Sequence, residues 1–230
     1  MNRKSVLVLG AMVLLLVHNG KADPVAEPNL SLPQVPRELA VELGIDENLP
    51  IPNYFSGWYY LPETLELSKK LGDAILFSGP LDLGTVLMLS TVASARNGCK
   101  YCLCAGFIIA EGVDVPKDTL VAIQGDLPND QLSVKENSLM QLAAGLTTNP
   151  ASARESVLHA TETGWSEAEV AHAIQVIALM NMNNLMAEGF GYPPDWIHPY
   201  DPEATIPIEE CGTPQQREVL LEFLGIGDSR

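Results

Sequence analysis

The sequence predicts an all-α protein, and three observations support that fold class. Ser133 with Glu136 and Ser166 with Glu169 each form the capping-box pattern that marks a helix start. Several segments place apolar residues at helical spacing. No segment of useful length alternates apolar and polar residues, as a half-buried strand does. The chain has 230 residues, enough for one domain with a proper core.

The first residues, MNRKSVLVLGAMVLLLVHNGKADP, are typical of a secretory signal peptide. Their apolar run, 6–17, is too short to cross a hydrocarbon layer of roughly 30 Å. Gly20 and Ala22 place small residues where a signal peptidase reads the chain, so we expect cleavage after Ala22 and a secreted or periplasmic protein. An uncleaved membrane anchor is the alternative.

The charge balance is strongly acidic. The 230 residues include 13 Lys and Arg against 29 Asp and Glu, a formal charge of −16. Loss of Arg3, Lys4 and Lys21 with the signal peptide would leave 10 basic residues against the same 29 acidic ones, or −19. Such a surface repels phosphate backbones and anionic membranes, so we expect no nucleic-acid partner.

Beyond residues 1–22 we predict three regions. Residues 23–60 are rich in proline and acidic residues and indicate an extended arm with one short helix near 37–43. Residues 61–191 are the helical body, and residues 192–230 form an irregular, aromatic tail that carries a short helix. We expect three aromatic residues of this tail to hold it against the body: Tyr192, Trp196 and Tyr200. The tail also carries the fourth cysteine, Cys211.

Within the body, the helices follow one another in order. Residues 62–76 form the first, and the almost uncharged segment 81–97 predicts a buried second helix. The third should begin at Asn97 and stop at Gly112, because glycine commonly ends a helix. The later helices follow Ser133, Asn149-Pro150 and Ser166, and the last of them should end at Gly189.

Three of the four cysteines lie in the stretch NGCKYCLCAG. Cys99 and Cys102 are three residues apart, so they share one face of a helix start, where the dipole favours a reactive thiolate. In such redox pairs one sulfur attacks and the other resolves the product as a disulfide. An inert structural disulfide between them is the alternative.

Cys104 projects on nearly the opposite side of the same helix, because it is two residues past Cys102. The three sulfurs therefore cannot converge on one metal ion, and we predict no metal site and no cofactor. Two interpretations of Cys104 remain open: a small buried apolar residue, or a disulfide with Cys211.

The stretches STVASARNGCKYCLCAG, GVDVP and TGWSEAEVAHAIQVIALMNMNNLMAEGFG resemble the carboxymuconolactone decarboxylase-like superfamily, and more narrowly its alkylhydroperoxidase D branch. The similarity covers about 130 residues, from 61 to 191. It implies an all-helical, alkylhydroperoxidase D-like domain that assembles as a trimer or hexamer. It also implies that peroxide oxidises Cys102 and that Cys99 is the proton donor and resolving thiol, with an unidentified reductant.

Two positions depart from the family pattern. A histidine four residues after the second cysteine is replaced by Gly106, and a glutamate twelve residues before the first cysteine is replaced by Leu87. Both ionisable partners of the proton relay are therefore missing. His172, which lies among apolar residues, fits a hydrogen-bonded core or interface residue better than a substitute base.

Two functions follow from these residues. The first is an exported thiol oxidoreductase that reduces hydroperoxides or exchanges disulfides through Cys99 and Cys102. The second is a non-catalytic scaffold or binding module of the same fold, with a structural disulfide between these cysteines. The pair motivates the first hypothesis, and the replacements at Leu87 and Gly106 motivate the second.

Overall fold

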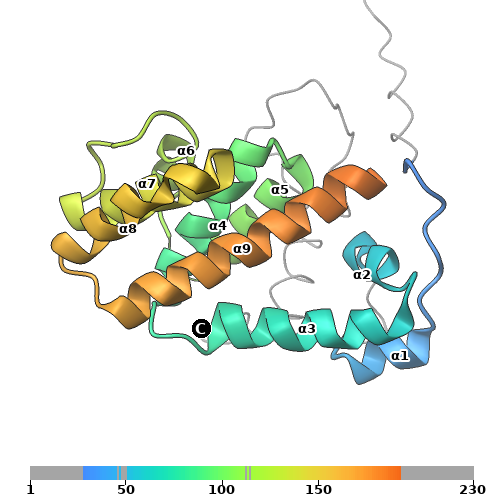
Figure 1. The fold of residues 1–230 in the computed structure, drawn as a ribbon. Helices are drawn as coiled ribbons and strands as arrows, with labels where there is room; N and C mark the ends of the chain where they lie inside the picture. The colour runs from blue at the N-terminus through green and yellow to red at the C-terminus, as the bar shows by residue number, and fades with distance from the viewer. Residues whose placement is uncertain (1–27, 46, 48–50, 112, 114, 193–230) are drawn as a thin grey trace, which may run out of the picture.

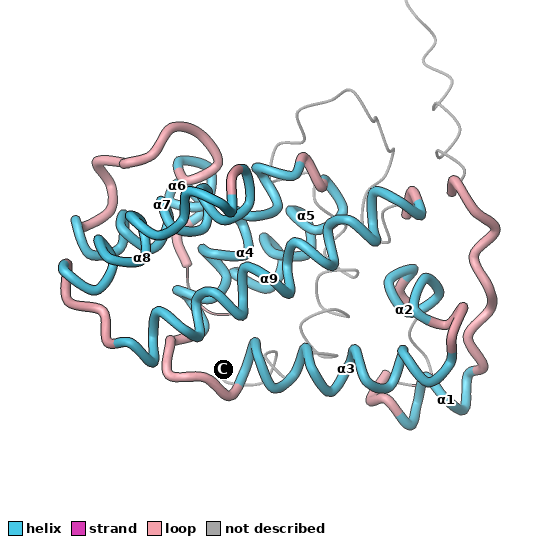
Figure 2. The backbone as a smooth tube through the Cα atoms, in the orientation of Figure 1, coloured by secondary structure: helices cyan, strands magenta, loops and turns pink. Residues whose placement is uncertain are grey.

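The computed structural model describes residues 28–45, 47, 51–111, 113 and 115–192, and in these ranges it is helical with no strand (Figures 1 and 2). The predicted signal peptide, Trp196, Tyr200 and the predicted helix of the tail lie outside the described residues. No helix in the described part is both long and apolar enough to cross a membrane. The helices are α1 Arg37–Glu42, α2 Asn53–Trp58, α3 Pro62–Phe77, α4 Leu83–Asn97, α5 Lys100–Glu111, α6 Lys117–Ala122, α7 Val134–Thr148, a short 3₁₀ turn Pro150–Ser152, α8 Ala153–Glu162 and α9 Glu167–Phe190.

Helix α4 is the central element of the core. All ten of its residues from 85 to 94 are buried, as the nearly uncharged sequence predicts. It packs chiefly against α9, α7 and α5, and Figure 1 shows α9 running across this group. A helix surrounded on every side needs apolar residues all round rather than on one stripe. The prediction of a buried second helix is therefore confirmed.

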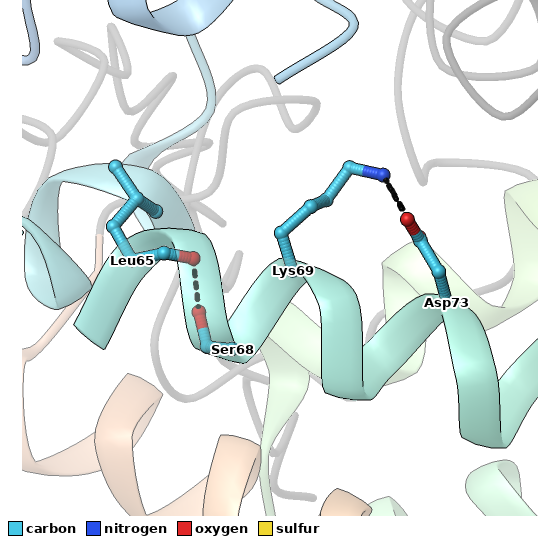
Figure 3. Close-up of polar contacts among 4 residues, drawn as sticks. All are labelled: Leu65, Ser68, Lys69 and Asp73. Atoms are coloured by element: carbon cyan, nitrogen blue, oxygen red, sulfur yellow. Dashed lines mark hydrogen bonds and ion pairs between the residues drawn. The ribbon is translucent and has the colours of Figure 1, made fainter. Parts of the chain in front are cut away.

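Helix α3 lies at the edge of the body and has two distinct faces. Its inner side buries Leu65 and Ser68, and the Ser68 hydroxyl donates to the Leu65 carbonyl at 2.8 Å (Figure 3). Lys69, one turn beyond Leu65, is partly buried and forms an ion pair with the more exposed Asp73 at 2.6 Å (Figure 3). The pair therefore lies at the border between the buried and the exposed side of α3, and Leu65 and Ser68 mark the buried side.

The N-terminal segment contributes more structure than one short helix. The predicted helix near 37–43 is present as α1, and α2 follows it unpredicted. Both contribute to a small second apolar cluster, whose buried residues include Ala40 of α1, Phe55 of α2 and Leu65 of α3. Gly57 of α2 is packed so closely against Tyr192 that a Cβ there would lie 1.7 Å from the tyrosine oxygen. The segment is therefore fastened to the body beside α3 and α9.

Three predicted helix boundaries need correction. Asn97 ends α4 instead of starting the next helix, because Gly98 adopts the left-handed conformation with φ of 68°. Helix α9 continues past Gly189 and ends at Phe190, with Gly191 in the left-handed conformation at φ of 65°. Asn149 makes no side-chain cap, and the 3₁₀ turn separates it from α8.

Candidate active site

The start of α5 places the two cysteines of the pair in different roles. Cys99 is the residue just before the helix, and its carbonyl accepts the first helical hydrogen bond, from the Leu103 N–H at 2.9 Å. Its Sγ accepts from the backbone N–H of Cys102 at 3.2 Å. Cys99 is thus the N-cap residue, two residues after the predicted helix start at Asn97, and Cys102 is the third residue of α5. Both sulfurs remain at the helix start, as predicted.

The pair is reduced, and its two thiols differ in environment. Cys99 and Cys102 are free cysteines, with exposed fractions of 0% and 8%. Interaction with the Cys102 side chain, together with burial, raises the pKa of the Cys99 thiol far above its usual value. Cys99 therefore keeps its proton at neutral pH.

Cys104 is separate from the pair. It is buried and disulfide-bonded, which favours the second of the two predicted interpretations. Cys211, its predicted partner, lies outside the described residues. With Cys104 engaged elsewhere, the chemistry at the start of α5 rests on two sulfurs.

A cavity of about 180 Å³ opens beside Cys102. Its walls come from α2, α3, α4, α5 and α9 and are mostly apolar. Its titratable groups, among the residues that the structure describes, are Tyr54, Tyr101 and Cys102. The cavity therefore presents a mostly apolar lining to the Cys102 sulfur, and no carboxylate or imidazole of the described residues belongs to that lining.

Both departures from the family pattern line this cavity. Leu87 of α4 closes one wall, and Gly106 of α5 lies one turn beyond Cys102. A Cβ built on Gly106 would find only the Thr91 hydroxyl within 4 Å, at 3.7 Å. The resemblance expects relay groups at these two positions, and both positions line the cavity. The first holds the alkyl side chain of Leu87, and the second, Gly106, leaves free space.

Helix α2 supplies a wall that sequence reasoning missed. Tyr54 and Phe55 line the cavity, and the Tyr54 backbone N–H donates to the Tyr101 hydroxyl at 3.2 Å. Burial is the largest cause that raises the pKa of Tyr54, and the nearby Cys102 adds to it. The aromatic run directly after Pro52 was the available signal, since proline commonly stands near the start of a helix.

Two asparagines of α9 form side-chain hydrogen bonds with α4. Asn181 accepts from the Asn97 side-chain amide at 2.6 Å, and Asn184 accepts from the Ser94 hydroxyl at 3.1 Å. Asn183 lines the cavity, and its Oδ1 has no hydrogen-bond partner in the described part of the molecule. The network fixes α9 against α4 at the level of the cysteine pair.

The histidines of the described chain do not reach the cavity. His172 is buried; its Nδ1 accepts from the Leu81 N–H at 3.3 Å, and its Nε2 lies 2.6 Å from the Ile75 carbonyl oxygen. Its two ring nitrogens therefore join α9 to the ends of the α3–α4 connection, which fits the predicted structural role. His159 is exposed on α8, and neither lines the cavity.

No protein-family model and no curated sequence matches the chain. Solved structures do. An uncharacterized peroxidase-related protein from Silicibacter sp. TM1040 aligns with TM-score 0.66 and 18% identity, over 76% of this chain and 96% of that one. The alkylhydroperoxidase AhpD core protein from Ralstonia eutropha JMP134 aligns with TM-score 0.61 and 19% identity, over 75% and 93%.

A third similar structure is the debrominase Bmp8, with TM-score 0.64 and 20% identity over 80% of this chain and 98% of that one. A variant of Bmp8 has also been solved with 2,3,4-tribromopyrrole bound. At these identities the likeness concerns the fold. The chain has the all-helical fold of these AhpD-like, peroxidase-related proteins.

Proposed function

We propose that the protein is an exported, thiol-dependent oxidoreductase that reduces hydroperoxides, with Cys102 as the attacking sulfur and Cys99 as the resolving one. The observation that carries this proposal is the arrangement of the pair. Both thiols are free, Cys102 lines the cavity, and Cys99 lies behind it with its Sγ on the Cys102 N–H. A substrate in the cavity would therefore meet Cys102 first.

The proposed reaction balances in two steps. The Cys102 thiolate attacks the distal oxygen of ROOH, the O–O bond breaks, and the products are Cys102 sulfenic acid and RO⁻, which takes up a proton to leave as ROH. The Cys99 sulfur then attacks the sulfenic sulfur, which forms the Cys99–Cys102 disulfide and releases water. An external dithiol reduces that disulfide and is itself oxidised to a disulfide.

The raised pKa of Cys99 fits the order of the two attacks. A thiol that keeps its proton is a poor nucleophile, so Cys99 does not compete with Cys102 for the peroxide. No carboxylate or imidazole of the described chain lines the cavity to assist. Because a positioned general acid or base typically contributes about 10²–10⁴ in rate, we expect slow turnover.

The test is peroxide consumption by the reduced protein supplied with a dithiol, with Cys102→Ser and Cys99→Ser in parallel. We expect turnover in the parent protein and none in Cys102→Ser. With the dithiol left out, pre-reduced Cys99→Ser should consume about one equivalent and stop, with a sulfenic acid that dimedone traps. Unchanged turnover in Cys102→Ser would refute the proposal.

The absence of relay groups at Leu87 and Gly106 supports a second candidate, a non-catalytic scaffold or binding module that keeps the fold. Here Cys99 and Cys102 would serve stability as a disulfide. This candidate predicts that, with the pair fully reduced, neither the parent protein nor Cys102→Ser shows peroxide turnover or disulfide exchange. It also predicts that oxidation of the pair raises the unfolding temperature. Assembly as a homo-oligomer is a proposal common to both candidates and rests on the family resemblance.

A further inference from the structure

We propose that the cavity beside Cys102 selects hydroperoxides with a compact, neutral, apolar body, such as an aryl or branched alkyl group, and that Gly106 is the residue that provides the space for it. This inference rests on the proposed function and goes beyond it, because it names the substrate class and the residue that determines it. Three features carry it: the free space at Gly106, the size of the cavity and its charge.

Gly106 is not required by the backbone. It lies inside α5, away from the left-handed conformations that the chain adopts at Gly44, Gly98, Gly164 and Gly191. Glycine inside a helix is less stable than alanine, because it loses more conformational freedom on folding. A Cβ at this position would be in no closer contact than 3.7 Å, to Thr91 Oγ1. What glycine contributes here is therefore space in the cavity.

The cavity has the size of a small ring. Its volume is about 180 Å³, and an apolar cavity of about 150 Å³ in another protein binds benzene. An apolar surface for such a body is supplied by the side chains of Leu87, Val86, Ile109 and Phe55 and by the Gly106 backbone. Hydrogen peroxide is polar at both ends and would lose hydrogen bonds to water there without gaining apolar contact.

The electrostatics of the site narrow the class of expected substrates further. No Lys, Arg or His side chain lines the cavity in the described chain, and the whole sequence carries a formal charge of −16. A substrate carboxylate would find no cation in the cavity and would approach through a repulsive field. The site therefore favours neutral hydroperoxides over fatty-acid hydroperoxides that are ionised at the same pH.

The experiment measures second-order rate constants for oxidation of the reduced protein by cumene hydroperoxide and by hydrogen peroxide. Gly106→Leu fills the cavity, and Gly72→Leu is the matched control, because Gly72 is also helical, has nothing within 4 Å of an added Cβ and does not line the cavity. We expect the ratio of the two rate constants to fall at least about tenfold in Gly106→Leu, in keeping with contacts worth a few methylene groups, and to stay unchanged in Gly72→Leu. Gly106→Ala fits without a clash and should lower this ratio by less. It replaces Gly106→Leu as the test variant if the leucine prevents folding.

Equal rates for both peroxides in the parent protein, or a ratio that Gly106→Leu leaves unchanged, would overturn the inference and leave the proposed function standing. A second readout keeps the two apart: binding of 2-phenyl-2-propanol, the alcohol product, to the Cys102→Ser protein, followed by NMR titration. If no hydroperoxide reacts but the alcohol binds and Gly106→Leu abolishes binding, the proposed function fails and the apolar site is upheld. Absence of binding would overturn the site.

Discussion

At the starts of α4 and α5, a side chain accepts a hydrogen bond from the backbone N–H three residues on, but the capping group differs. Before α4, Asp82 Oδ1 accepts the Thr85 N–H at 2.9 Å, and its Oδ2 accepts the Thr85 hydroxyl at 2.7 Å. Before α5, Cys99 Sγ accepts the Cys102 N–H at 3.2 Å. A carboxylate is a strong acceptor and a thiol sulfur is a weak one. The second helix start thus has the weaker cap and carries the two free thiols.

The difference indicates a division of labour between helix starts. Asp82, Ser133 and Ser166 cap α4, α7 and α9 with oxygen acceptors, and these helices form most of the frame. At α5 the capping atom is also the sulfur that we propose as the resolving one. In the proposed reaction this sulfur forms a bond to the Cys102 sulfur, so the chemistry would act on the group that caps the helix. We therefore expect oxidation to loosen the first turn of α5.

The largest expected effect is the alkaline response of the Cys99 cap. Its folded-state pKa is raised, so above the unfolded value of about 8.5 the unfolded chain loses a proton that the folded chain keeps. The stability of the reduced protein should then fall with rising pH, approaching about 1.4 kcal/mol per pH unit for one proton. Urea unfolding of the parent and of Cys99→Ser between pH 7 and 10 measures it. Parallel curves for both proteins would show that Cys99 titrates normally.

The next effect concerns the oxygen cap of α4. Asp82→Ala removes the acceptor of the Thr85 N–H and should cost about 1 kcal/mol of unfolding free energy. Asp82→Asn keeps an acceptor oxygen and is the control. Burial opposes ionisation of Asp82, but hydrogen bonds from Thr85 outweigh it and lower the pKa, so the charge-dependent part is present above about pH 4 and is lost as pH falls. Equal stability of Asp82→Ala and the parent would show that this cap contributes nothing.

Local patterns predicted the features that are decided within one turn. The capping boxes at Ser133 and Ser166 are present, with both reciprocal hydrogen bonds, because donor and acceptor are three residues apart. The end of α9 was placed too early at Gly189. There the side chain of Asn29, about 160 residues away in sequence, donates to the carbonyls of Glu188 and Gly189. A local sequence pattern cannot predict a hydrogen-bond partner so far away in the sequence.

The same distinction holds for the site. The spacing of Cys99 and Cys102 and the family positions Leu87 and Gly106 placed four residues in one region, and the structure places three of them, all but Cys99, in the wall of one cavity. The wall contributed by Tyr54 was missed, because α2 has only six residues and is held by tertiary contacts rather than by its own propensity. Residues 23–60 were interpreted by composition, which says little about where such a short helix packs.

The smallest expected effect separates capping from chemistry at α5. Cys99→Ser replaces a weak acceptor with an oxygen that is a preferred N-cap, while it loses the packing of a fully buried sulfur. These two changes oppose each other, so at pH 7 the reduced variant should differ from the parent by less than the roughly 1 kcal/mol expected for Asp82→Ala. Urea unfolding of the two variants side by side measures the difference. A larger loss in Cys99→Ser would mean that the sulfur holds α5 through packing, and the weak-cap account of this helix start would have to be abandoned.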